Sequence, residues 1–190
     1  MSIVSPKAMS VTAQGEPDGW EVQEGYDVQP MPDGSTRLLV SLPAPRLAEG
    51  FCAIAPVLGA RVGVLYRQYV NRMTPGPNGA QPVDYIALEL PLESVLAAAR
   101  TASTLLFHDA RAELWLRGDL GDQMILDRDG LIYCYPDDPA FRDAVKALEL
   151  REGAMEVLLE RDYVKHFFHS ENDVLEQEFI ASLGLSRVGQ

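Results

Sequence analysis

Hydrophobic and polar residues alternate over several short stretches of this sequence, and a period of two is typical of β-strands with one buried face. Gly, Pro, Asn and Asp, which favour turns, separate these stretches. The alternation predicts strands at residues 20–28, 36–42, 61–70, 83–90, 112–117, 123–126 and 131–135. Because short turns join several neighbouring strands, we expect a mainly antiparallel sheet.

Two of these stretches also show which side chains share a face. In residues 83–90, the alternation places Ile86, Leu88 and Leu90 on one face of the strand. In residues 61–70, it places the valines and Tyr66 opposite a face that includes Tyr69. The connection between the two strands, residues 74–82, is rich in Pro and Gly and is expected to be an exposed loop.

Apolar residues three and four positions apart mark the helices. The strongest pattern covers residues 92–106 after Pro91, a residue suited to the first turn because its missing N–H is not needed there. Further helices are predicted at residues 139–148 and 174–183, whereas residues 47–57 and 155–168 carry conflicting signals and stay unassigned. Together these elements predict an α+β fold, a mainly antiparallel sheet with helices packed on one side.

Length and composition fit one folded domain. Of the 190 residues, 47% are apolar and 23% are charged, values typical of globular proteins. Residues 1–17 lack periodicity and are expected to form a flexible N-terminal tail, followed by a single α+β domain over residues 18–190. No stretch has the length and apolar character of a signal peptide or a membrane span, so a cytoplasmic protein without a membrane partner is expected.

Acidic residues outnumber basic ones. There are 28 Asp and Glu against 16 Lys and Arg, which gives a formal net charge of −12. This balance argues against a nucleic-acid partner, because phosphate neutralisation needs a basic face. Two interpretations remain open: the acidic surface keeps molecules apart in solution, or it attracts a partner protein that has a basic surface.

One short motif resembles a known active site. Residues 124–132 place Asp127-Arg-Asp-Gly130 between two apolar segments, which resembles the first motif of the haloacid-dehalogenase phosphatases. The resemblance implies a nucleophile at Asp127, an acid/base at Asp129 and a parallel strand that ends at the motif. However, that family's later motifs do not follow, and Asp-Gly between apolar strands is typical of a hairpin turn. We therefore expect a hairpin.

Histidines provide a second candidate for chemistry. His166, His169 and Asp173 are spaced so that they would share one side of a continuous helix. Two imidazoles and a carboxylate can hold a divalent metal with open positions. Residues 170–172 resemble a helix break, and in that case the histidines would be the polar face of an amphipathic element. A metal-dependent hydrolase that uses these residues therefore stays an alternative, and no other cofactor is expected.

Aromatic residues are concentrated on the predicted strands. Tyr66, Tyr69 and Trp115 are candidate binding residues, because an exposed aromatic sheet face suits protein binding. The alternative is that such side chains cover sheet edges with their polar groups in water. Since no catalytic set is complete, the favoured expectation is a non-catalytic protein-interaction module, such as an adaptor, a neutralising partner or a chaperone-like protein. Pairing of free sheet edges would also give a homodimer.

Overall fold

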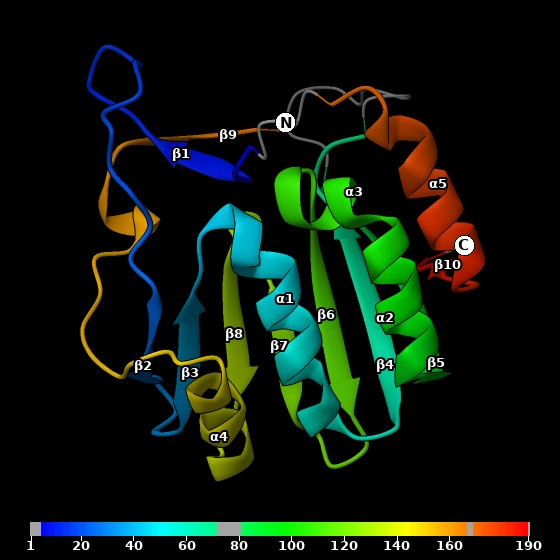
Figure 1. Ribbon diagram of the computed structural model, residues 1–190. Coiled ribbons are helices and arrows are strands. Elements are labelled where there is room, and N and C mark those ends of the chain that lie inside the picture. The colour runs from blue at the N-terminus through cyan, green and yellow to red at the C-terminus, as the bar shows by residue number, and fades with distance from the viewer. Residues whose placement is uncertain (1–4, 72–80, 167–168, 190) are drawn as a thin grey trace.

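The main element of the computed structural model, which describes residues 5–71, 81–166 and 169–189, is an antiparallel sheet (Figure 1). Its eight strands are β2 (Gly25–Pro30), β3 (Thr36–Ser41), β4 (Arg61–Gln68), β5 (Val83–Pro91), β6 (Ala112–Gly118), β7 (Gln123–Leu126), β8 (Leu131–Tyr135) and β10 (Ser186–Arg187). They lie in the order β10-β5-β4-β6-β7-β8-β3-β2, and each pairs antiparallel with its neighbours. The predicted antiparallel sheet is confirmed.

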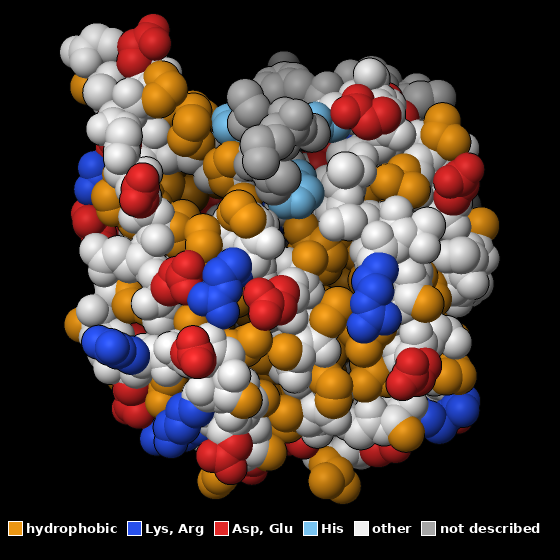
Figure 2. Space-filling view, viewed as in Figure 1, with side chains coloured by type: hydrophobic (Ala, Val, Ile, Leu, Met, Phe, Trp, Pro, Cys, Tyr) orange, Lys and Arg blue, Asp and Glu red, His pale blue; other side chains and the backbone are white. Residues whose placement is uncertain are grey.

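Helices cover one face of this sheet (Figure 1). The described residues form α1 (Ala44–Ile54), α2 (Leu92–Thr101), α3 (Ser103–His108), α4 (Pro139–Ala147) and α5 (Asn172–Ser182), and a short 3-10 helix, η1 (Ala55–Leu58), continues α1. Figure 2 shows this side of the molecule, where acidic and basic side chains are interspersed around hydrophobic ones. The prediction of an α+β fold with helices on one side is therefore confirmed.

The alternation of residues in β4 explains why the sheet has two different faces. Val62, Val64 and Tyr66 face the helices and are fully buried or nearly so, in a core shared with α1, α2 and α3. Leu65 and Arg67 lie on the opposite face and are only half-buried. We call this second side of the sheet the outer face.

The motif Asp127-Arg-Asp-Gly130 forms the turn of the β7–β8 hairpin. The Asp127 carboxylate accepts hydrogen bonds from the backbone N–H groups of Asp129 and Leu131, each at 2.8 Å. Such side-chain bonds to the following backbone are typical of turns built on aspartate. The motif joins two antiparallel strands, as the hairpin interpretation predicted, and does not follow a parallel strand as the phosphatase resemblance implied.

Several element boundaries differ from the predictions. The first predicted strand starts at Gly25 and not at residue 20, because its partner strand β3 ends at Ser41, the residue that pairs with Gly25. The predicted helix over 92–106 is divided at Ala102, and α3 then buries three consecutive apolar side chains. The unassigned residues 155–168 contain a 3-10 helix, η2 (Leu158–Glu160), and a strand, β9 (Tyr163–Lys165). The loop expected at 74–82 lies almost entirely outside the described residues.

Part of the segment expected to be a flexible tail is packed against the domain. Strand β1 (Ala8–Ser10) pairs with β9 in a separate two-stranded sheet. Lys7 is 2% exposed, and its ammonium group donates to the carbonyl oxygens of Leu106 at 3.0 Å and Ala112 at 3.2 Å. Strand pairing and a buried ammonium group therefore pack residues 7–11 against the domain.

Within the described ranges, no helix combines the length and the apolar character that crossing a lipid bilayer requires.

Candidate binding site

The outer face of the sheet is covered unevenly. Val157, in the segment that follows α4, packs with Leu39, Ile125 and Tyr133 in a second apolar cluster over β3, β7 and β8. On β5 the situation is different, since Ile86 is 38% exposed and Leu88 is 76% exposed. We call the outer side of β4, β5 and β6 the open half. Large exposed apolar side chains on a concave surface are typical of interaction sites.

A groove of about 310 Å³ lies on the open half. Its lining is mainly apolar and includes Gly63, Leu65, Ile86, Leu88, Trp115 and Arg117. A volume of this size is at the lower end of the range for ligand pockets. Gly63 has only hydrogen in place of a side chain, so backbone atoms form the floor beneath Leu88. Because the exposed side chains of Ile86 and Leu88 line it, we take the groove as a candidate binding site.

A β-bulge gives the groove its shape. Val62 pairs with Leu90 and Val64 pairs with Ala87, so that both Leu88 and Glu89 lie opposite Gly63. Glu89 has a φ of 56°, in the left-handed region that a bulge often requires. Beyond the bulge Leu90 packs against the main core, while Ile86 and Leu88 stay exposed. The prediction that these three residues share a face is wrong for Leu90, because the extra residue reverses the alternation.

Arginine side chains lie over aromatic rings on the outer face. The guanidinium carbon of Arg67 is 5.3 Å from the ring centroid of Trp115, and Arg67 also forms a two-bond ion pair with Asp84 at 2.8 Å. Arg37 lies 4.5 Å from the centroid of Tyr133 in the same way. Each such contact contributes about 0.5–1 kcal/mol at exposed sites. The arginines therefore fix these rings in place, and Trp115 remains half-buried beside the groove.

Of the three aromatic residues expected to bind a partner, the structure places only Trp115 at the groove. Tyr66 is 0% exposed and donates from its hydroxyl to Glu176 at 2.5 Å. Its interpretation as a surface residue is corrected, because its position in β4 faces the helices. Tyr69 follows the end of β4, where the guanidinium carbon of Arg128 lies 4.4 Å from its ring centroid. Tyr69 does not line the groove.

The proposed metal ligands do not share a helix. His166 follows β9, and α5 begins only at Asn172. The Nδ1 atom of His166 is 3.0 Å from the carbonyl oxygen of Pro6, and Asp173 accepts from Arg111 at 2.8 Å. Among residues 5–71, 81–166 and 169–189, no three His, Cys, Asp or Glu side chains come together as a metal site. His166 and His169 lie outside the helices of the described residues, so the continuous helix that the metal site required is not formed, and His166, His169 and Asp173 make no ligand set there.

Arg111 is the centre of a buried charge cluster. Its guanidinium is 2.9 Å from Asp109, 2.8 Å from Asp173 and 3.5 Å from Glu176, and Arg111 and Asp109 are both 0% exposed. Burial raises the pKa of Glu176, although hydrogen bonds from neighbouring groups oppose that shift. These contacts join the start of β6 to α5, and we interpret the cluster as structural.

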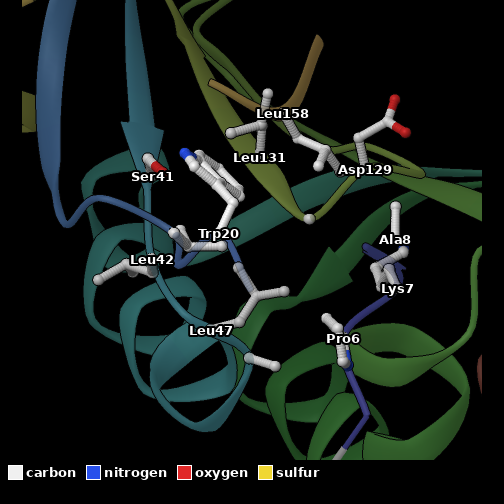
Figure 3. Close-up of a pocket in the computed structure, with 13 residues that line it drawn as sticks. Pro6, Lys7, Ala8, Trp20, Ser41, Leu42, Leu47, Asp129, Leu131 and Leu158 are labelled. Carbon is white, nitrogen blue, oxygen red and sulfur yellow. The ribbon is translucent and has the colours of Figure 1, made fainter. Parts of the chain in front are cut away.

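A small hollow lies where the N-terminal segment meets the β7–β8 turn (Figure 3). Its volume is about 20 Å³, enough for one water molecule. Figure 3 shows the carboxylate of Asp129 pointing away from the ring of Trp20, and this carboxylate pairs with Lys165. Burial and Asp129 raise the pKa of Asp127 to about 6, and burial lowers the pKa of Lys7 to about 8. The shifted pKa values therefore arise mainly from burial, and the hollow is too small for a substrate.

The chain matches no protein-family model, no curated protein and no solved structure. The candidate site therefore depends on the geometry described above. Sequence reasoning did not single out Ile86, Leu88 or Arg117 as site residues. The sequence did contain one indication that these residues are exposed. Residues 83–90 carry apolar side chains on both faces of the strand, and helices packed on one side of the sheet can cover only one of those faces.

Proposed function

We propose that the protein is a non-catalytic interaction module, which binds another protein through the groove on the outer face of its sheet. The observation that carries this proposal is the 76% exposure of Leu88 beside a mainly apolar groove of about 310 Å³. Burying one such side chain at an interface contributes about 1.5–3 kcal/mol. A groove of this kind is suited to apolar side chains that project from a partner's surface.

This site is better suited to contacts with a partner's side chains than to pairing with a strand of the partner. Strand β10 already pairs with Tyr85 and Ile86, and Val188 donates to the carbonyl oxygen of Asp84. The bulge at Glu89 and the ring of Pro91 interrupt the rest of this edge, and both features oppose strand pairing. The partner's side chains, rather than its backbone, would therefore supply most of the contact.

The partner is expected to carry a basic surface around its apolar contact. The net charge is −12, and six of the cationic side chains already form ion pairs within the fold: Arg46, Arg67, Arg111, Arg142, Arg161 and Lys165. The acidic excess is thus available to attract a basic protein, which raises the association rate and makes it depend on salt. A cytoplasmic location belongs to the same proposal.

Photo-crosslinking tests where a partner binds. The photoreactive amino acid p-benzoylphenylalanine replaces Gln123, which lines the groove, and in a control protein it replaces Glu93, an exposed residue of α2. We expect a discrete adduct from position 123 in cell extract and none from position 93. Adducts from position 93 alone would contradict the proposal, because α2 lies on the helix-covered side.

The captured protein is then purified, and its affinity is measured for the wild type and two variants. Leu88→Asp places a charge in the groove and is expected to weaken binding by at least about tenfold, which corresponds to about 1.4 kcal/mol. Val174→Asp changes a residue of α5 that is 60% exposed and is expected to leave binding unchanged. Equal affinities for the two variants would contradict the proposed site.

A further inference from the structure

We infer that the groove also binds a second copy of this chain, which gives a two-fold symmetric dimer joined through the open halves of the two sheets. The inference rests on the proposed function in one respect, since it takes the groove to be a protein-binding site. It goes further because it names an occupant and identifies the residues that would make the contact.

The open half carries a protrusion and a hollow side by side. Leu88 projects from β5 with 76% of its surface exposed, and it also forms one wall of the groove. The groove beside it has a volume of about 310 Å³, which is enough for an incoming side chain. A two-fold interface requires that one surface be complementary to itself. With Leu88 near the axis, each copy can place this side chain in the groove of the other.

The charges beside the groove have the same self-complementary arrangement. Arg117 lines the groove and forms no ion pair with the acidic side chains of the described residues. Glu89 is exposed and follows Leu88 directly, and its carboxylate likewise has no ion-pair partner in the described part of the chain. In a two-fold arrangement, Glu89 of each copy approaches Arg117 of the other. The interface thus contains the same apolar contact and the same ion pair twice.

The net charge of −12 does not prevent this association. At physiological ionic strength the Debye length is about 8 Å, so repulsion between distant acidic groups of two copies is largely screened. A short pair between Glu89 and Arg117 at a partly desolvated interface is screened much less. Local attraction and apolar burial therefore decide whether two copies associate. Because both occupants use the same groove, the second copy would compete with the partner protein.

Sedimentation velocity over about 1–100 µM protein tests the dimer. We expect a reversible equilibrium between monomer and dimer for the wild type. Leu88→Asp is expected to raise the dimer dissociation constant by at least about tenfold. Leu120→Asp is the matched control, since Leu120 is 92% exposed but does not line the groove, and it is expected to leave the constant unchanged.

A charge exchange tests the two-fold geometry. Glu89→Arg and Arg117→Glu, each alone, are expected to weaken self-association by about tenfold, because each puts like charges together at both contacts. An equimolar mixture of the two variants is expected to dimerise as well as the wild type, since each contact then joins one arginine and one glutamate. Glu93→Arg, on α2, is the control for the change in net charge and is expected to have no effect.

A wild type that stays monomeric at 100 µM overturns this inference, as does a dimer that Leu88→Asp leaves intact. Failure of the mixed variants to associate overturns it as well. These outcomes are separate from the proposed function, because mass spectrometry of the adduct from position 123 distinguishes a second copy of this chain from another protein. A monomer that still binds the captured protein in a Leu88-dependent manner removes the dimer and leaves the proposed function in place. Circular dichroism confirms that each exposed-site variant is folded.

Discussion

The hydroxyl group of Tyr66 donates a hydrogen bond of 2.5 Å to the Glu176 carboxylate, which joins the middle of β4 to α5 inside the core. Burial raises the pKa of this carboxyl group, while the hydrogen bond from Tyr66 and the charge of Arg111 act in the opposite direction. The bond is therefore one of the contacts that offset the free-energy cost of burying a carboxylate. Tyr66 supports the fold and is not available to a partner.

Tyr66→Phe is expected to lower the free energy of unfolding by about 1–3 kcal/mol, because the buried carboxylate loses a donor. Urea denaturation measures this change. Tyr163→Phe is the control, since Tyr163 lies on the short strand β9 at a half-buried position, and its effect is expected to stay within about 0.5 kcal/mol. Similar losses in the two variants would show that the bond to Glu176 is not what stabilises the core.

Asp127→Asn is expected to change how stability depends on pH. Burial, followed by the charge of Asp129, raises the pKa of Asp127 from 3.8 to about 6, so the folded chain keeps this proton to higher pH than the unfolded chain. The stability that this group contributes is complete below about pH 4 and is lost as pH rises to about 6. The shift corresponds to a loss of about 3 kcal/mol at most.

The asparagine variant retains the oxygen that accepts from Asp129 and Leu131 but cannot ionise. Unfolding free energies of wild type and variant, measured from about pH 4 to about pH 7, are therefore expected to diverge. The wild type should lose stability relative to the variant over this interval. A constant difference between the two proteins would contradict the assigned shift.

Glu149→Gly is expected to stabilise the protein. Glu149 follows the C-cap of α4 with a φ of 63°, a conformation that glycine adopts without strain and that costs other residues about 1–2 kcal/mol. For a domain of this size, a gain of about 1 kcal/mol raises the melting temperature by about 2–4 °C. Glu149→Ala removes the same side chain without relieving the strain, and calorimetry should find no comparable rise for it.

Gly63→Val is expected to separate binding from stability. Gly63 is an interior residue of β4, and atoms 3.8 Å or more from the site of a new Cβ leave room for it. Valine favours strands over glycine by about 0.5–1 kcal/mol, so thermal stability should be retained or increased. The same side chain fills the floor of the groove and should weaken partner binding by at least about tenfold. Unchanged affinity would show that the groove floor is not part of the contact.

Most strands and helices could be predicted, because the apolar positions that alternate in the sequence are the positions that are buried in the fold. Residues 112–117, 123–126 and 131–135 alternate or end at strong turn signals, and each forms a strand within one residue of the expected bounds. The packed position of Lys7 could not be predicted, because its two carbonyl acceptors are about a hundred residues away in sequence. Local patterns carry no information about such distant partners.

The candidate site was predicted only in part, since Trp115 lies at the groove and Tyr66 does not. Both residues belong to strands with clear alternation, but the sequence does not state which face the helices cover. The bulge at Leu88 and Glu89 adds a second difficulty, because it reverses the alternation within a single strand. Leu88 is exposed because the helices cover the other face of the sheet and because the bulge turns Leu90, and not Leu88, towards the core.

Methyl-resolved NMR of the wild type with the captured, purified partner protein tests the central claim most directly. We predict that the methyl signals of Leu65, Ile86 and Leu88, which line the groove, shift or broaden when the partner is added. The methyl signals of Val174 on α5, which lie on the helix-covered side, should stay in place. Changes confined to Val174 and its neighbours, with the groove signals unaffected, would contradict binding at the outer face.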